Sequence, residues 1–200
     1  MTLRYTEIQL DALRELANIA SGTAATSLSQ LLGHEVGLSV PNVVALDLAD
    51  AVDAAGDPGE TVTGVALGFQ GDTTGVMLLL LRRDAAAMLC AMLDVEPGSE
   101  VGDSALGEVG NILGAGYLTA IGAMTGVGME PSTPFVQTDL LGAIVASLLA
   151  QTAGSEESGL LINTRLDITD ESCTITFLLL PEEGGVHDLL APLGLAESVV

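Results

Sequence analysis

The chain of 200 residues contains no lysine and no tryptophan, and five arginines are its only strongly basic side chains. Against them stand 27 aspartate and glutamate residues, so the formal net charge is −22. Such a charge repels the phosphates of nucleic acids and of anionic membranes, which argues against both as partners. It is best tolerated where salt screens it, since the Debye length is only about 3 Å at 1 M salt. We therefore expect a salt-adapted, haloarchaeal-like source.

Long apolar runs and cysteine clusters are also missing. The longest nearly apolar run, residues 140–150, is well short of the about 20 residues that cross a membrane. The first ten residues lack the charged and apolar regions of a signal peptide. Cys90 and Cys173 lie in apolar stretches, which favours two buried thiols over a disulfide framework or a metal site. These absences predict a cytoplasmic protein without membrane insertion.

Apolar residues are abundant and make up 48% of the chain, whereas aromatic residues make up only 2%. That apolar content suffices for a buried interior, and the interior must be aliphatic. Thr6 and Gln9 form a capping-box pattern, after which a helical period runs to about Leu32 and stops at Gly33. Further helices are expected at 84–93 (capped by Asp84), 103–125, 138–151 and 185–193, and strands at 61–70, 74–81, 159–168 and 173–180. Residues 39–48 look extended, 49–60 form an acidic loop with room for a short helix, and 94–103 form a linker.

The order of these elements recurs, and the recurrence is visible in the residues. Ten of the 32 positions from 12 to 43 carry the same residue 93 positions later. The matching pairs are Ala12 and Ala105, Leu13 and Leu106, Glu15 and Glu108, Asn18 and Asn111, Ile19 and Ile112, Thr26 and Thr119, Gly33 and Gly126, Ser39 and Ser132, Pro41 and Pro134, and Val43 and Val136. We interpret residues 1–200 as a single α+β domain built by internal duplication from two pseudo-symmetric halves, 1–93 and 94–200. The halves would share an antiparallel or mixed sheet, with two long site-bearing helices on its outside.

Within this repeat, an acidic or hydroxyl residue, a glutamate, an asparagine and a proline recur at the same spacing. They are Asp11, Glu15, Asn18 and Pro41 in the first half, and Ser104, Glu108, Asn111 and Pro134 in the second. This pattern resembles the signature of the CheC/CheX/FliY family of chemotaxis phosphatases. CheC-type members carry both copies and no appended domain, and this chain is similar to them over nearly its whole length.

The resemblance implies that the substrate is the aspartyl phosphate of the response regulator CheY. The regulator brings its own Mg²⁺ and an active-site lysine, so no cofactor is expected in this chain. An amide both donates and accepts hydrogen bonds, so Asn18 or Asn111 could hold a water in line with the phosphorus without a general base. Glu15 and Glu108 would each pair with the regulator's lysine.

The remaining motif residues are expected to support these four. Asp11 and Ser104 lie one turn earlier, where the family pattern accepts either type, and we assign them to support or docking. Pro41 and Pro134 lack an N–H group and favour extended backbone, so they are expected to fix the exit from the helix into the sheet. The family also implies the receptor deamidase CheD as a second partner. No motif fixes its docking surface, and the apolar run 139–151 could serve for this or for the core.

Alternatives remain open on the sequence alone. Without the duplication, Glu15 and Glu108 would be read as parts of a solvated helix face. A metal site is disfavoured, because one glutamate and one asparagine supply too few oxygen ligands. A CheC-like adaptor that binds CheD or a regulator, with weak hydrolysis or none, is the main alternative function. A flagellar or archaellum switch component is a further one, against which the lack of an appended switch domain argues.

Overall fold

The computed structural model describes residues 5–39, 42–47, 50–151, 158–168, 171–182 and 185–195. The helices are α1 (Glu7–Leu32), α2 (Ala51–Ala55), α3 (Arg83–Met92), α4 (Glu100–Thr125), α5 (Leu141–Gln151) and α6 (Gly185–Leu190), followed by a 3₁₀ turn at Ala191–Leu193. The strands are β1 (Val36–Leu38), β2 (Asn42–Asp47), β3 (Thr61–Gly71), β4 (Gly75–Arg82), β5 (Met129–Pro131), β6 (Phe135–Leu140), β7 (Ser158–Ile168) and β8 (Glu171–Pro181). The predicted α+β class is therefore confirmed.

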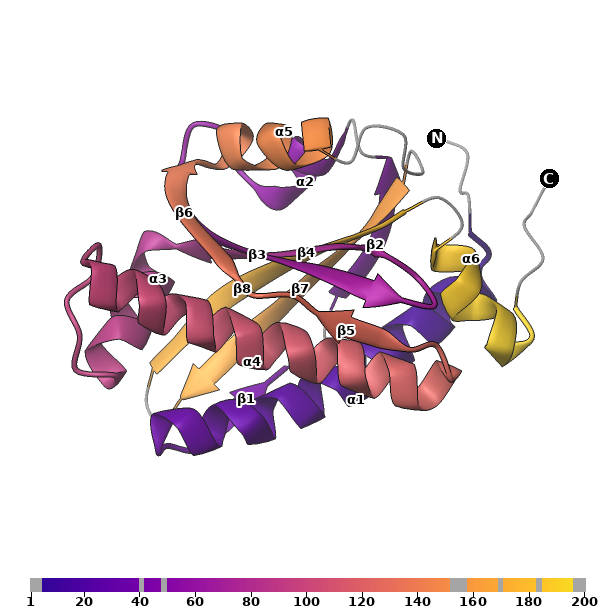
Figure 1. Ribbon diagram of the computed structural model, residues 1–200, viewed down its shortest axis with the longest axis horizontal. Helices are drawn as coiled ribbons and strands as arrows, with labels where there is room; N and C mark the ends of the chain where they lie inside the picture. The colour runs from indigo at the N-terminus through magenta and orange to yellow at the C-terminus, as the bar shows by residue number, and fades with distance from the viewer. Residues whose placement is uncertain are drawn as a thin grey trace.

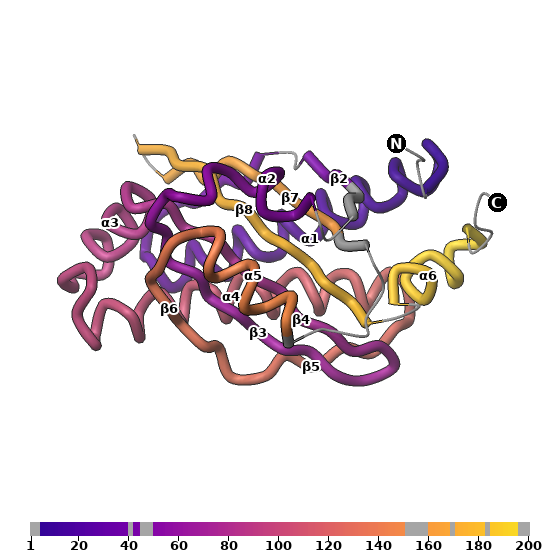
Figure 2. The backbone as a smooth tube through the Cα atoms, turned by 90° about the horizontal axis from the view of Figure 1, so that it is seen from above, coloured from indigo at the N-terminus to yellow at the C-terminus, as the bar shows by residue number. Residues whose placement is uncertain are grey.

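The strands form one eight-stranded sheet in the order β1-β7-β8-β4-β3-β5, with β2 also beside β7 and β6 beside β3. Every strand pair among the described residues is antiparallel. Helices α1 and α4 lie on one side of the sheet, and α2 and α5 lie on the other (Figure 1). Seen from above, α2 lies near β2 and β7, beside α5 (Figure 2). The molecule thus has a helix–sheet–helix arrangement.

The central strands are apolar on both faces because both faces are covered. In β4, Met77 and Leu79 belong to the apolar cluster beneath α1 and α4, whereas Leu78 and Leu80 belong to the cluster beneath α2 and α5. The alternation follows from the period of two along a strand. It explains why the run from 76 to 81 contains no polar residue.

Helix α1 begins and ends where the sequence predicts. The Thr6 hydroxyl accepts a hydrogen bond from the Gln9 backbone N–H, and the Gln9 side chain accepts one from the Thr6 backbone N–H. Gly33 ends the helix at φ 68°, a left-handed conformation that favours glycine. The apolar side of this helix faces the core: Leu10, Leu13, Leu16, Ala17, Ala20, Ala24, Leu28 and Leu32 are buried, and Leu31 is partly buried.

Two predicted helix starts are wrong. Arg82, not Asp84, is the N-cap residue of α3, and Asp84 lies in the first turn, where its Oδ1 accepts from the Ala85 N–H at 2.9 Å. Helix α4 begins at Glu100 instead of 103, because the Ser99 hydroxyl caps it by accepting from the N–H of Gly102 at 3.0 Å. The predicted linker therefore contains the N-cap residue Ser99, and its last four residues belong to α4.

The helix predicted from 138 begins at Leu141, because residues 138–140 pair with β3 as the end of β6. Strands β1, β5 and β6 have no counterpart among the predicted strands. No described helix is long and apolar enough to cross a membrane.

Helices α1 and α4 pack against each other in antiparallel directions. The Ser21 hydroxyl donates to the Ala17 carbonyl at 2.8 Å and accepts from the Tyr117 hydroxyl at 2.5 Å. A Cβ placed on Gly116 would lie 3.1 Å from the Cα of Ala24, so the two backbones approach closely at this point. A buried hydrogen bond and a small residue together hold the two helices in one layer.

Candidate functional site

The first motif lies on the outer side of α1. Asp11, Glu15 and Asn18 are all exposed. At their spacing the three side chains share one helix face, and the Cβ atoms of Glu15 and Asn18 are about 5–6 Å apart. Two exposed apolar residues flank them on the same face, namely Ile8 (67% exposed) and Ile19 (44% exposed). The carboxylate and the amide therefore stand between apolar side chains that are open to a partner.

The second motif repeats this arrangement on α4. Ser104 and Glu108 are exposed, and Asn111 is half-buried. Val101, which is 64% exposed, stands before this motif as Ile8 stands before the first, while Ile112 is half-buried. Sequence reasoning missed Ile8 and Val101. Their equal spacing from the two motifs was available in the sequence, but their exposure depends on how each helix lies on the sheet.

The two sites differ in charge beside the glutamate. In the first, Arg14 Nη1 lies 2.6 Å from Asp11 Oδ1, in an exposed ion pair of the kind that contributes little to stability. In the second, Gly107 stands at the position of Arg14, and a Cβ there would lie 3.1 Å from Val136 Cγ2. The first site thus has an ion pair next to its glutamate. At the corresponding position of the second site, α4 packs closely against β6.

The structure describes only one of the two motif prolines. Pro134 lies directly before β6, and its Cγ would be 3.9 Å from a Cβ on Gly107. It therefore stands at the start of a strand and against the helix that carries Glu108. Pro41 lies outside the described residues, so its predicted role stays a prediction.

The two sites lie far apart on the helical layer. Glu15 precedes Ser21 by six residues, or about 9 Å of helix, and Glu108 precedes Tyr117 by nine residues, or about 13 Å. Because the helices are antiparallel and meet at Ser21 and Tyr117, the two glutamates lie on opposite sides of this contact. About 20 Å along the helix axes separates them, so each can be approached by itself.

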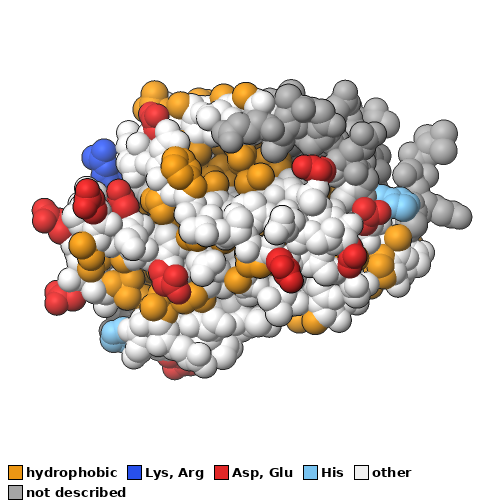
Figure 3. Space-filling model, in the orientation of Figure 1, with side chains coloured by type: hydrophobic (Ala, Val, Ile, Leu, Met, Phe, Trp, Pro, Cys, Tyr) orange, Lys and Arg blue, Asp and Glu red, His pale blue; other side chains and the backbone are white. Residues whose placement is uncertain are grey.

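The chemistry available at each site is that of one carboxylate and one amide on an open surface. Acidic side chains are scattered over the face that α4 occupies, whereas arginine shows at only one place, at the edge of this view (Figure 3). No group of three or more His, Cys, Asp or Glu side chains within the described residues could hold a metal ion. Each site can thus pair with a cation and orient a small molecule by hydrogen bonds. It resembles a surface that completes a partner's active site more than a closed catalytic cleft.

Comparisons with known proteins agree with the duplicated motif. The model of the CheC-like family matches residues 8–45 and 101–137, which contain the two motifs. The CheY-P phosphatase CheC of Bacillus subtilis is 30% identical over 200 residues, which cover 94% of this chain and 95% of that protein. CheC1 of Halobacterium salinarum is 27% identical over 132 residues, or 63% of this chain and 67% of that protein. The crystal structure of Thermotoga maritima FliY has a TM-score of 0.79 at 20% identity, covers 98% of this chain and 100% of that chain, and shares the fold.

Proposed function

Because the chain belongs to the CheC-like family, we propose that it hydrolyses the aspartyl phosphate of a CheY-type response regulator. One observation carries this proposal: matching glutamate–asparagine pairs stand on α1 and α4, exposed except for the half-buried Asn111, in a chain whose relative, 30% identical over nearly full length, is a CheY-P phosphatase. A phosphatase for a protein substrate needs such an open site, because the phosphoryl group lies in the partner's own pocket.

In the proposed reaction, water attacks the phosphorus of the acyl phosphate and the bond from phosphorus to the aspartate oxygen breaks. The products are inorganic phosphate and the free aspartate of the regulator. The amide of Asn18 or Asn111 accepts a hydrogen bond from the attacking water and holds it in line, since phosphoryl transfer depends mostly on positioning and electrostatics. Glu15 and Glu108 anchor the regulator by pairing with its lysine, and the regulator supplies Mg²⁺. Contact at a partly dried interface keeps this pair effective in high salt.

Asp11 and Ser104 support docking in this proposal and take no part in the chemistry. The ion pair of Asp11 with Arg14 supports such a role, because it engages the carboxylate within its own helix. Pro134 keeps the start of β6 against α4, which fixes the helix that carries Glu108 and Asn111.

The test is the decay of phosphorylated regulator in molar KCl, with and without the protein. The combined variant Asn18→Ala and Asn111→Ala should lose the acceleration of decay. Gln30→Ala is a matched control, since it removes another exposed amide of α1, about 18 Å along the helix from Asn18. If the combined variant still accelerates decay as the unmodified protein does, with its circular dichroism unchanged, the proposed mechanism is wrong.

We also propose that CheD modulates this activity, as the family implies. Titrating CheD into the same assay should change the lifetime of the phosphorylated regulator. Binding of CheD without any hydrolysis by the protein would instead support the adaptor function. In α5, one face is committed to the core by Leu141, Ile144, Val145 and Leu148. Any contact of α5 with CheD must therefore use its opposite face.

We further propose that the two halves arose by internal duplication and act in a salt-rich cytoplasm. Both halves have the element order α-β-β-α-β-β-α. The family model matches segments that begin 93 residues apart, at 8 and 101, which is the offset of the two motifs. The net charge of −22 supports the salt-rich setting.

A further inference from the structure

A pocket on the side of the sheet away from α1 and α4 contains polar side chains that the proposed hydrolysis does not use. Its volume is about 520 Å³, within the range of small-molecule sites. Residues 54–56 at the end of α2 line one wall. The polar side chains that line it are Arg82, Asp84, Asn163, Thr174 and Thr176.

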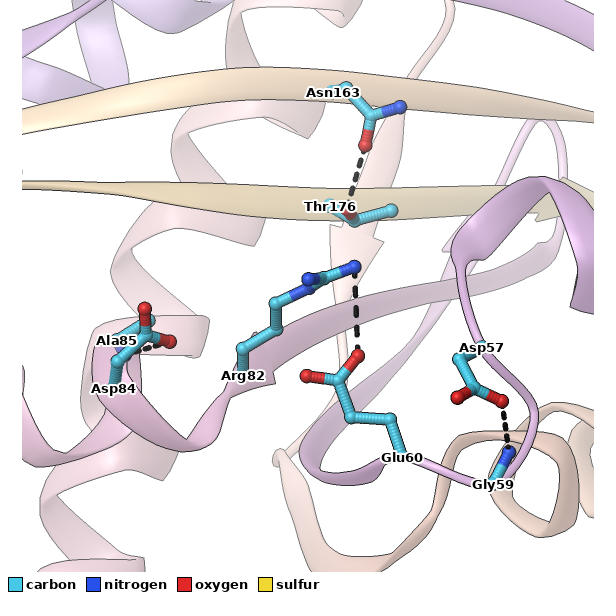
Figure 4. Close-up of polar contacts among 8 residues, drawn as sticks. All are labelled: Asp57, Gly59, Glu60, Arg82, Asp84, Ala85, Asn163 and Thr176. Carbon is cyan, nitrogen blue, oxygen red and sulfur yellow. Dashed lines mark hydrogen bonds and ion pairs between the residues drawn. The ribbon is translucent and has the colours of Figure 1, made fainter.

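The pocket is rich in hydrogen-bond donors. The Asn163 Oδ1 accepts from the Thr176 hydroxyl at 2.6 Å, which leaves the amide nitrogen turned away (Figure 4). Among the described residues no acceptor engages that nitrogen. Arg82 Nη2 lies 3.5 Å from Glu60 Oε2, a loose pair that leaves further guanidinium N–H groups available. With the exposed Thr174 hydroxyl, three donors from three neighbouring strands face one space.

The other half of the chain shows that the sheet itself does not require these polar residues. Asn163 pairs with Thr176 and with the first residue of β2, just as Ala66 pairs with Leu78 and with the first residue of β6. Leu78 is 1% exposed, and Ala66 packs beside it in the apolar cluster beneath α5. The same places in the fold are thus apolar in one hairpin and polar in the other.

The difference in cover follows from helix length. Helix α5 has 11 residues, whereas α2 has five, and within the part of the chain that the structure describes α2 only borders the pocket. Thr176 is nevertheless only 9% exposed and is held by its bond to Asn163. Thr176 and Asn163 therefore hold each other in place and are not merely side chains turned to water.

We propose that this pocket binds a small zwitterion of the α-amino-acid class. The ligand's carboxylate lies against the Arg82 guanidinium, the Asn163 amide and the Thr174 hydroxyl, because a planar carboxylate matches the donor geometry of arginine. Its ammonium group faces Asp84, the carboxylate that lines the pocket, while Glu60 stays paired with Arg82. The field of a chain with net charge −22 repels a simple anion, whereas a zwitterion has no net charge to repel.

The test is a titration of the full chain with L-alanine in molar KCl, monitored by NMR through the amide resonances of residues around the pocket. L-alanine should give saturable shifts, while acetate and methylammonium, which each lack one of the two charges, should bind at least tenfold more weakly. Arg82→Gln and Thr174→Val should each weaken L-alanine binding at least tenfold. Arg83→Gln is the matched control, since it removes the adjacent exposed arginine, which does not line the pocket.

Two outcomes would overturn the proposal. Without saturable shifts for L-alanine there is no such site, and equal affinity for acetate would make it a plain anion site. Thr174→Val keeps the shape of an exposed side chain, so its folding serves as a check on the arginine variant. The readout does not use phosphatase activity, so a negative result would refute the pocket proposal without bearing on the proposed function.

Discussion

Ionisation of Tyr117 should loosen the contact between α1 and α4, the helices that carry both motifs. The side chain is fully buried, its ring centroid lies 4.8 Å from that of Phe177, and its hydroxyl donates to Ser21. Burial raises the pKa of Tyr117 from its usual 10 to about 12. The folded chain thus holds this proton more tightly than the unfolded chain, so stability falls as the pH rises from about 10 to about 12. At about 1.4 kcal/mol per pKa unit, the loss is about 1.4 kcal/mol at pH 11 and approaches about 2.7 kcal/mol above pH 12.

The assay is denaturant unfolding followed by circular dichroism at pH 8 and pH 11, in molar KCl. At pH 8, Tyr117→Phe should be less stable than the unmodified protein by about 1 kcal/mol, because Ser21 loses its donor. At pH 11 this difference should vanish or reverse, since the variant has no phenol to ionise. Tyr5→Phe is the control, and between pH 8 and pH 11 it should lose as much free energy of unfolding as the unmodified protein. Cys173, whose pKa burial raises to about 11, titrates in all three proteins and cancels in the comparison. If Tyr117→Phe loses as much stability as the unmodified protein, ionisation of Tyr117 is not the cause.

Removing the exposed apolar groups with Ile8→Ser or Val101→Ser should raise KM for phosphorylated regulator severalfold and leave kcat within about twofold, because apolar contact binds ground and transition states alike. A fall in kcat with KM unchanged would contradict this. Gly110→Ala should lower the free energy of unfolding by about 1–3 kcal/mol, since its Cβ would lie 2.5 Å from Val65 Cγ1. Gly22→Ala, with open space around it, should raise that energy by up to about 1 kcal/mol, and equal effects of the two changes would refute the packing argument. Lowering KCl from 2 M to 0.1 M should reduce Tm, because the 22 excess negative charges then repel one another with less screening; a constant Tm would exclude this.

The long helices and central strands could be predicted because their signals are local. Helix α1 is bounded by Thr6 and Gly33, and β4 is a continuous apolar run because both faces of it are covered. Strand β6 carries no such signal. Five of its six residues are exposed and it follows Pro134, so only its hydrogen bonds to β3 make it a strand. These pairs join residues 69 to 79 positions apart, and such distant pairing leaves no periodicity in the sequence from which the strand could be predicted.

The same distinction separates the two candidate sites. Each motif lies within one helix, so residue spacing alone places Glu15 beside Asn18 and Glu108 beside Asn111. The pocket instead combines Arg82 with residues 163–176 through strand register, and no spacing in the chain joins them. A site built across strands becomes visible only when the register is known.

The way the strands are shared ties the two motifs to one folding unit. Strands β1 and β2 of the first half pair with β7, and β5 and β6 of the second half pair with β3. A chain cut after residue 93 would leave β3 with an open edge and β1 and β2 without partners. Helix α4 of the second half also rests on β3 of the first, where Gly110 meets Val65. We therefore propose that residues 1–200 form one domain: a perturbation beneath either motif helix acts on strands of the opposite half, so the duplicated sites cannot be divided into two independent modules.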